Sequence, residues 1–280
     1  MSRLALVVPC FNEAERFRPD TFGSALREFS ALSLVLVDDG SSDGTRGVLN
    51  RFAAEQADRV AVLALAANMG KAEAVRLGLQ RALESDVDFV GYWDADLATP
   101  LDAVPDFMRV FEHHPAVEVV IGSRVRLLGR DIRRSAVRHY TGRVFATAAS
   151  HVLGIPVYDT QCGAKVFRTS ARLHRILASP FASRWIFDVE LIGRYLDDTA
   201  DAVNGPPSID RIYELALRRW VDEPGSKVRA KDGVRAAGDL LRIYRSRSRP
   251  AAPVAPAGTP RVPLDASVSK SLRTDRSSRS

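Results

Sequence analysis

Short apolar runs alternate with amphipathic segments through the first half of the chain. The apolar runs are rich in valine and end at turn residues, which is typical of buried strands; they span 4–9, 34–38, 60–65, 88–94 and 117–122. The segments between them have helical periodicity, near 20–30, 43–56, 70–84 and 101–113. Strands that alternate with helices predict an α/β fold, with a mostly parallel central sheet flanked by helices.

The second half of the chain is less regular. Its expected helices lie near 138–153, 169–178, 186–197 and 231–245, and a strand-like stretch spans 210–221. On the last of these helices an apolar stripe is expected from Val234, Ala237, Leu241 and Tyr244. We therefore predict a folded domain over 1–230, an amphipathic helix over 231–245 and a disordered tail over 246–280, which is rich in Pro, Ser and Arg.

The charge of the chain is unevenly placed. The formal net charge is +6. Residues 245–280 hold eight Lys/Arg and two Asp and account for all of that excess, so no nucleic-acid partner is expected. A second basic concentration lies within the neutral remainder, because residues 124–143 hold seven Arg and one Asp.

Composition narrows the class of protein further. Hydrophobic residues make up 46% of the chain, which excludes disorder for most of it, and two cysteines exclude a disulfide scaffold. No apolar run approaches ~18 residues, and the N-terminus lacks the features of a signal peptide. The expected location is therefore cytoplasmic.

Polar residues follow each of the five expected strands. They are Asn12-Glu13, Asp38 to Gly44, Asn68 to Lys71, Asp94-Ala95-Asp96 and Gly122-Ser123-Arg124. The carboxyl ends of parallel strands share one edge of a sheet, where ligands bind in such folds. We therefore expect one site at this edge.

Two of these segments suggest chemistry. Asp94 and Asp96 are the hard oxygen ligands that Mg²⁺ or Mn²⁺ prefers, with a diphosphate completing the coordination. Lys71 opens a helix and would meet an anion there. The alternatives stay open: a solvated turn with a helix cap, and a capped helix with a solvated lysine. The chain has neither a P-loop motif nor a GxGxxG motif, and its five histidines have no zinc-ligand spacing.

Taken in order, eight stretches resemble one enzyme family. They are VVPCFNEAER (7–16), LVDDGSSDGT (36–45), NMGKAEAVRLG (68–78), WDADLATP (93–100), IGSRV (121–125), DTQCGAKVFR (159–168), FDVELI (187–192) and WVDEPGSKV (220–228). This set is similar to the inverting family-2 glycosyltransferases of the GT-A fold, within them to the dolichyl- and polyprenyl-phosphate β-glucosyltransferases. The resemblance covers residues 4 to about 230. Many of these relatives carry a transmembrane anchor, which this sequence does not show.

The resemblance implies a role for several residues. Pro9, Glu13 and Asp38 would hold the base and ribose of a nucleotide-sugar, and Lys71 would lie near the nucleotide. Arg124, Ser226 and Lys227 would meet its phosphate charge, and Asp94 and Asp96 would lie near the diphosphate and bind Mg²⁺ or Mn²⁺. Asp159, Gln161, Asp188 and Glu190 would line the sugar and acceptor side. Asp96, Asp188 and Glu190 are the expected catalytic residues, and Asp188 or Glu190 would be the base if the acceptor is a hydroxyl. A structural salt-bridge network is the alternative for Asp188 and Glu190.

The implied reaction is a metal-dependent, inverting transfer of a hexose, glucose from UDP-glucose, to a polyprenyl or dolichyl phosphate. Arg130, Arg133 and Arg134, with Arg138, would bind the acceptor phosphate at the inner face of a membrane, where Val137 and Phe145 would enter the interface. A solvated basic loop is the alternative for this stretch. Transfer from the same donor to a soluble hydroxyl acceptor also remains open, as does the oligomeric state.

Overall fold

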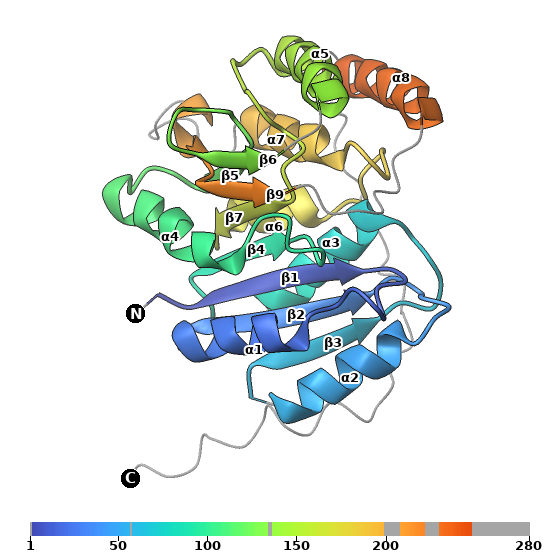
Figure 1. Ribbon diagram of the computed structural model, residues 1–280. Coiled ribbons are helices and arrows are strands. Elements are labelled where there is room, and N and C mark those ends of the chain that lie inside the picture. Colours follow the sequence, from blue (N-terminus) through green and yellow to red (C-terminus); the bar gives the residue numbers. More distant parts are fainter. Residues whose placement is uncertain (1, 57, 134–135, 199–207, 222–229, 248–280) are drawn as a thin grey trace. The chain divides into compact units, whose positions relative to one another are not determined.

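A seven-stranded sheet forms the centre of the computed structural model, which describes residues 2–247 apart from 57, 134–135, 199–207 and 222–229 (Figure 1). The strand order is β3-β2-β1-β4-β7-β5-β8. The strands are β1 (Leu4–Cys10), β2 (Leu32–Asp38), β3 (Val60–Ala64), β4 (Phe89–Trp93), β5 (Val119–Ser123), β7 (Ala164–Arg168) and β8 (Ile212–Ala216). Every neighbouring pair is parallel except the two that involve β7. The expected mostly parallel sheet is confirmed.

Helices cover both faces of this sheet (Figure 1). They are α1 (Pro19–Glu28), α2 (Thr45–Glu55), α3 (Lys71–Leu83), α4 (Val104–His113), α5 (Ala136–Leu153), α6 (Ala171–Leu177), α7 (Phe187–Asp197) and α8 (Ala230–Arg247), with short 3₁₀ turns at Leu101–Ala103 and Ser208–Arg211. Alternate residues of each strand serve opposite faces, so Leu4 and Leu6 pack with α1 and α4, whereas Ala5 and Val7 pack with α3 and α7.

Two short strands form a separate small sheet that the sequence did not predict. β6 (Asp131–Arg133) pairs in parallel with β9 (Arg219–Val221). The stretch expected to be one strand over 210–221 is therefore two strands, β8 and β9, that join different sheets. β7 is the other unexpected strand, and it is antiparallel to both of its neighbours.

The apolar stripe expected on the C-terminal helix is not the side of that helix that packs against the protein. In α8, Leu240 and Ile243 are buried and pack against α5 and α7, whereas Leu241 and Tyr244 are about half exposed. Neighbouring helical residues point about 100° apart, so a stripe displaced by one position faces a different side. The side chain of Val234 lies outside the described residues.

The chain divides into two units, Met1–Ser248 and Arg249–Ser280. The predicted tail lies almost entirely outside the described residues; only Ser246 and Arg247 are described, and both belong to α8. Within the described part of the chain, no helix is long and apolar enough to cross a membrane.

Candidate active site

The predicted polar residues meet at one edge of the sheet. β1, β2, β4 and β5 are parallel, so the residues that follow them lie at the same edge. β7 runs the other way and pairs Ala164 with Trp93, which brings the segment before β7 to the end of β4. Residues 159–163 therefore lie beside Asp94, although about seventy residues of chain separate them.

Asp94 and Lys71 form an ion pair at the centre of this edge. Their Oδ1 and Nζ atoms are 2.6 Å apart, and each side chain is about a third exposed (33% and 30%). Burial alone lowers the pKa of Lys71, but the charges of Asp94, Asp188 and Asp96 together with the hydrogen bond to Asp94 outweigh it, and the net pKa is raised. Lys71 is therefore a permanent cation that faces the site. Gly70, with φ of 92°, sets the turn into α3 just before it.

Asp96 lies two residues further on and is suited to a metal ion. Its Oδ1 accepts a hydrogen bond from the backbone of Ala98, 3.0 Å away. Burial raises the pKa of Asp96, and the negative charge of Asp94 raises it further. A divalent cation would relieve this repulsion, so the pair fits Mg²⁺ or Mn²⁺. Among the described residues there is no group of three or more His, Cys, Asp or Glu that could hold a metal ion, so water or a diphosphate would have to complete the coordination.

Asp38 does not present its carboxylate to a ligand. Its side chain is fully buried, Oδ1 accepts the backbone N–H of Ser41 at 3.0 Å, and Oδ2 accepts Nε of Arg46 at 2.8 Å. Both oxygens are used within the turn after β2. The expected contact of Asp38 with base or ribose does not fit this geometry, because a ligand would have to displace Arg46 or open the turn.

The neighbouring Asp39, which the sequence did not single out, organises the site instead. Its carboxylate accepts the backbone N–H groups of Met69 and Gly70, at 2.7 and 2.9 Å, and the side-chain amide of Asn68 at 3.1 Å. These bonds fasten the end of β2 to the start of α3. Asp39 therefore fixes the helix terminus from which Lys71 reaches Asp94.

Pro9 and Glu13 lie at the end of β1, as expected. Pro9 pairs in register with Val37 and is partly exposed. Glu13 is buried, its backbone N–H donates to Oγ1 of Thr45 at 2.8 Å, and its carboxylate pairs with Arg16. This geometry places both residues at the edge of the sheet without assigning either a ligand.

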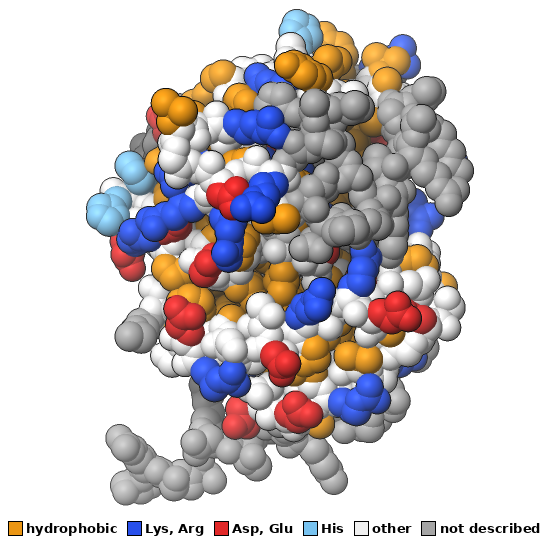
Figure 2. Space-filling model, viewed as in Figure 1, with side chains coloured by type: hydrophobic (Ala, Val, Ile, Leu, Met, Phe, Trp, Pro, Cys, Tyr) orange, Lys and Arg blue, Asp and Glu red, His pale blue; other side chains and the backbone are white. Residues whose placement is uncertain are grey.

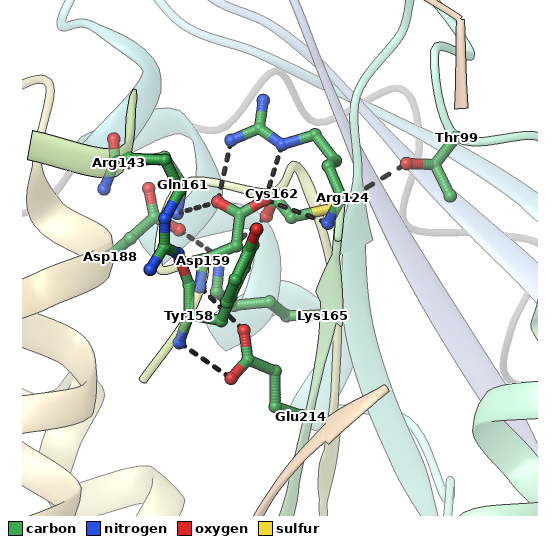
Figure 3. A network of polar contacts seen from close by, with 10 residues as sticks. All are labelled: Thr99, Arg124, Arg143, Tyr158, Asp159, Gln161, Cys162, Lys165, Asp188 and Glu214. Carbon is green, nitrogen blue, oxygen red and sulfur yellow. Dashed lines mark hydrogen bonds and ion pairs between the residues drawn. The ribbon is translucent and has the colours of Figure 1, made fainter. Parts of the chain in front are cut away.

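Arg124 is held in a three-part network (Figure 3). Its Nε and a terminal nitrogen donate to the two oxygens of Asp159, at 2.6 and 2.8 Å. Glu214 on β8 in turn accepts the backbone N–H groups of Tyr158 and Asp159, at 2.8 and 2.7 Å. Asp159, expected to contact the acceptor, therefore anchors Arg124 instead, and so does not fit that role. Its Oδ1 also accepts the backbone N–H of Gln161, at 3.1 Å, which leaves the amide side chain of Gln161 on the same edge.

Asp188 and Glu190 both form ion pairs, as the salt-bridge alternative predicts. Asp188 is buried, pairs with the fully buried Lys165 at 2.5 Å, and accepts the hydroxyl of Tyr92. Protonating it would leave Lys165 buried without a counter-ion, which makes Asp188 a poor general base. Glu190 pairs with Arg194 at 2.7 Å and accepts the backbone N–H of Ala182. Residues two apart on a helix point about 200° apart, so these carboxylates do not act on one substrate atom. The expected base role therefore does not fit either residue.

The basic stretch after β5 is only partly described. Arg130 is exposed, and Arg133 is exposed and pairs with Asp131 at 2.9 Å. Arg134, Ser226 and Lys227 lie outside the described residues, as do the side chains of Val137 and Arg138. Phe145 packs partly buried against the core, and its expected place in a membrane interface stays a prediction.

An open groove of about 480 Å³ adjoins Asp96, which the sequence did not predict. Three arginines line it, Arg16, Arg18 and Arg219. Leu97, Pro100 and Leu101 form apolar parts of its wall. Its arginines come from segments far apart in the chain, the loop after β1 and strand β9, so only the fold brings them together.

Comparison with known proteins decides the family. The pattern of glycosyl transferase family 2 matches residues 5–173. A dolichyl-phosphate beta-glucosyltransferase of Dictyostelium discoideum is 31% identical over 257 residues, covering 86% of this chain and 73% of that protein. The chain therefore belongs to glycosyl transferase family 2.

Other relatives agree with this membership. The dolichyl-phosphate beta-glucosyltransferase of Drosophila melanogaster is 34% identical over 250 residues, covering 80% of this family-2 glycosyltransferase and 69% of the fly protein. Among solved structures, the glucosyl-3-phosphoglycerate synthase of M. tuberculosis superposes with a TM-score of 0.58 at 20% identity, covering 88% of this chain and 80% of that one. The expected GT-A-like fold and the glycosyltransferase activity are confirmed.

Proposed function

We propose that this glycosyltransferase transfers glucose from UDP-glucose to a polyprenyl phosphate, with Mg²⁺ or Mn²⁺ bound by Asp94 and Asp96. The observation that carries the proposal is the cluster at the end of β4, where Asp94 pairs with Lys71 at 2.6 Å and Asp96 lies two residues away. Two carboxylates can bind a metal ion and a lysine can bind a phosphate group, so this cluster suits a ligand that contains both.

The names of the relatives support the donor and the acceptor. The dolichyl-phosphate beta-glucosyltransferases cover 86% and 80% of this chain at 31% and 34% identity. A solved structure with the same fold holds Mn²⁺, UDP and its glucosylated product, with a TM-score of 0.57 at 20% identity. We propose that the same classes of ligand, a divalent metal ion, a uridine nucleotide and a polyprenyl phosphate, bind at the edge of the sheet around Asp94.

In the proposed reaction an oxygen of the acceptor phosphate attacks C1 of glucose opposite the leaving UDP, so configuration inverts. The metal ion supplies electrostatic stabilisation of the charge that develops on the diphosphate. Lys71 adds a fixed positive charge from the N-terminus of α3, and Arg124, immobilised by Asp159, adds another from the far side of β4. Pro9 and Glu13 line the proposed nucleotide end, and Ser226 and Lys227 are proposed to contact the diphosphate.

The ion pairs of Asp188 and Glu190 favour a phosphate acceptor over a hydroxyl acceptor. A phosphate monoester is already anionic near neutral pH, so its attack needs no general base, whereas a hydroxyl acceptor needs one. Both carboxylates are held in ion pairs with Lys165 and Arg194. We assign the acceptor phosphate to Arg130, Arg133 and Arg134, with Gln161 on the sugar side, and place the reaction at the cytoplasmic face of a membrane.

Radiolabelled UDP-glucose with Mg²⁺ or Mn²⁺ and a polyprenyl phosphate tests the proposal. Label should pass into the organic phase, EDTA should abolish the transfer, and Asp96→Asn should reduce it at least 100-fold. Asp58→Asn, a change at an exposed carboxylate, serves as the matched control and should leave the rate unchanged. Transfer only to a water-soluble hydroxyl compound, or none from any nucleotide-sugar, would overturn the proposal.

A further inference from the structure

The outer sides of α5 and α8 expose large apolar and tyrosine side chains. On α5, Tyr140 and Val144 are 71% and 74% exposed; on α8, Leu241 and Tyr244 are 47% and 48% exposed. The two helices pack against each other. We call these four residues the α5–α8 face.

The same helices bury other side chains, so this exposure is not a sign of poor packing. α5 buries Ala146, Ala149 and Leu153, and α8 buries Leu240 and Ile243. Tyr140 and Val144 are one turn apart, as Leu241 and Tyr244 nearly are, so each helix has a second apolar stripe that points outward. An exposed apolar stripe lowers the solubility of a protein unless another apolar surface covers it.

On α5 and α8, the exposed charged side chains that the structure describes are arginines. The sequence of α5 contains no acidic residue, and α8 carries Arg242 and Arg245 on its exposed side, beside Leu241 and Tyr244. Asp239, the acidic residue within the described side chains of α8, is partly buried and binds Ser183 and Arg242. In Figure 2 hydrophobic side chains lie beside Lys and Arg where Figure 1 shows these helices.

This combination selects a partner of one kind. A second copy of the chain related by two-fold symmetry would bring two arginine-bearing surfaces together, which is repulsive. An anionic lipid surface instead receives the arginines at its headgroups, and the apolar and tyrosine side chains at the boundary of its acyl region. Tyrosine is enriched at that depth.

We propose that the α5–α8 face docks this glycosyltransferase onto an anionic membrane surface. The proposal builds on the proposed function, because a polyprenyl phosphate is held in a bilayer. α5 also leads to the site: Arg143 lies over the ring of Tyr158, 3.7 Å from its centre, and Tyr158 precedes the Asp159 that anchors Arg124. Docking through α5 would therefore bring the edge of the sheet close to the lipid headgroups.

Vesicle co-sedimentation of the full chain tests the docking. Vesicles of phosphatidylcholine with 30% phosphatidylglycerol should bind the wild type. Val144→Ser/Leu241→Ser should weaken that binding about ten-fold, because both changes remove apolar surface without changing charge. Ile209→Ser, at a residue that is 44% exposed elsewhere on the protein, is the matched control and should stay within two-fold. All three proteins keep residues 248–280, so any binding through that segment is common to them.

Separate measurements distinguish the possible failures. Tyr140→Ser/Tyr244→Ser provides a second variant, and thermal melts check that each variant folds. Equal vesicle binding by the wild type and both folded variants would overturn the docking, as would a variant that only converts a dimer to a monomer in sedimentation. Transfer to a ten-carbon, water-soluble isoprenyl phosphate should be unchanged in the variants. Vesicle binding that depends on the face, without transfer to any isoprenyl phosphate, would refute the proposed function and leave the docking intact.

Discussion

The carboxylate of Asp94 occupies the space that a side chain would need at Gly163. A Cβ atom built on Gly163 would lie 1.8 Å from Oδ2 of Asp94, and the backbone N–H of Asp94 donates to the carbonyl of Gly163 at 2.9 Å. The first residue of the proposed metal pair is thus fixed by a backbone that passes at contact distance. Only glycine permits this approach without moving the carboxylate.

Gly163→Ala should therefore impair the site more than the fold. The methyl group forces Asp94 away from its position beside Lys71, and misplacement of about 1 Å near reacting groups costs on the order of 100-fold in rate. We expect weaker Mn²⁺ binding by calorimetry and a transfer rate lower by about that factor. Gly47→Ala, in α2, where an added Cβ has only ordinary contacts, is the control. Unchanged Mn²⁺ affinity in the Gly163 variant would contradict the prediction.

The buried pair of Lys165 and Asp188 should matter for stability. Asp188→Asn leaves the fully buried Lys165 without a counter-ion, and breaking such a pair costs about 3–5 kcal/mol of unfolding free energy. Lys165→Met/Asp188→Asn removes the unpaired charge and should recover much of that loss, as measured by urea unfolding. If Asp188 were a catalytic base, the double variant would be stable and inactive; we expect it to retain transfer activity.

Glu214 should act through the loop that carries Asp159. In Glu214→Gln an amide can no longer accept both backbone N–H groups, and losing a hydrogen bond to a charged group costs about 1.5–3 kcal/mol. The melting temperature should fall by several degrees, and transfer should slow because Arg124 loses its fixed place. Glu55→Gln, at an exposed residue at the end of α2, is the control. A variant that melts and reacts like the wild type would show that the loop is held by other contacts.

Neither cysteine should react in the native protein. Burial raises the pKa of Cys162 to about 11, with a further contribution from the charge of Asp159. Burial also raises the pKa of Cys10, and Glu13 and Asp38 reinforce the effect. The reactive thiolate is therefore scarce at pH 7.5, and both sulfurs are inaccessible. Iodoacetamide should label no thiol in buffer and two in guanidinium chloride. Rapid labelling of Cys162 under native conditions would contradict this burial.

A related consequence concerns alkaline pH. A thiol whose pKa is raised in the folded protein holds its proton longer than in the unfolded chain, where the pKa is near 8.5. For Cys162 the folded protein therefore binds more protons between about pH 8.5 and the folded pKa of about 11. The free energy of unfolding should decline across that interval as pH rises, and Cys162→Ala should flatten the decline.

The parallel part of the fold follows from the sequence because its signals are local. β1 and β2 are apolar on both sides and end at polar turns, and the helices between strands keep their own period. β7 was missed because its five residues include Lys165 and Arg168, so it does not resemble a buried strand. Lys165 is buried only because Asp188, from a later helix, meets it there.

The residues of the site divide in the same way, into those that local sequence signals predict and those whose role depends on contacts made in the fold. Asp94, Asp96 and Lys71 could be predicted because they lie in or directly after the segments that connect parallel strands to the next helix, at one edge of the sheet. Whether Asp38 or Asp39 faces the site depends on Arg46 and on Gly70, and such partners cannot be inferred from order along the chain. Gly163 lay within a recognised stretch, but its role became visible only once β7 was seen to pair with β4.

The position of β7 in the sheet has a consequence for synthesis on the ribosome. β1 to β4 are neighbours in the sheet and can associate as soon as they emerge, because domains fold as their segments become available. At that stage β4 still has a free edge, and Asp94 lacks the backbone of Gly163. The nascent chain therefore exposes one unpaired edge of β4 until residues 164–168 leave the exit tunnel, and Asp94 should reach its final position only after that. The insertion of β7 between β4 and β5 would thus join the two parts of the sheet and bring Gly163 to Asp94.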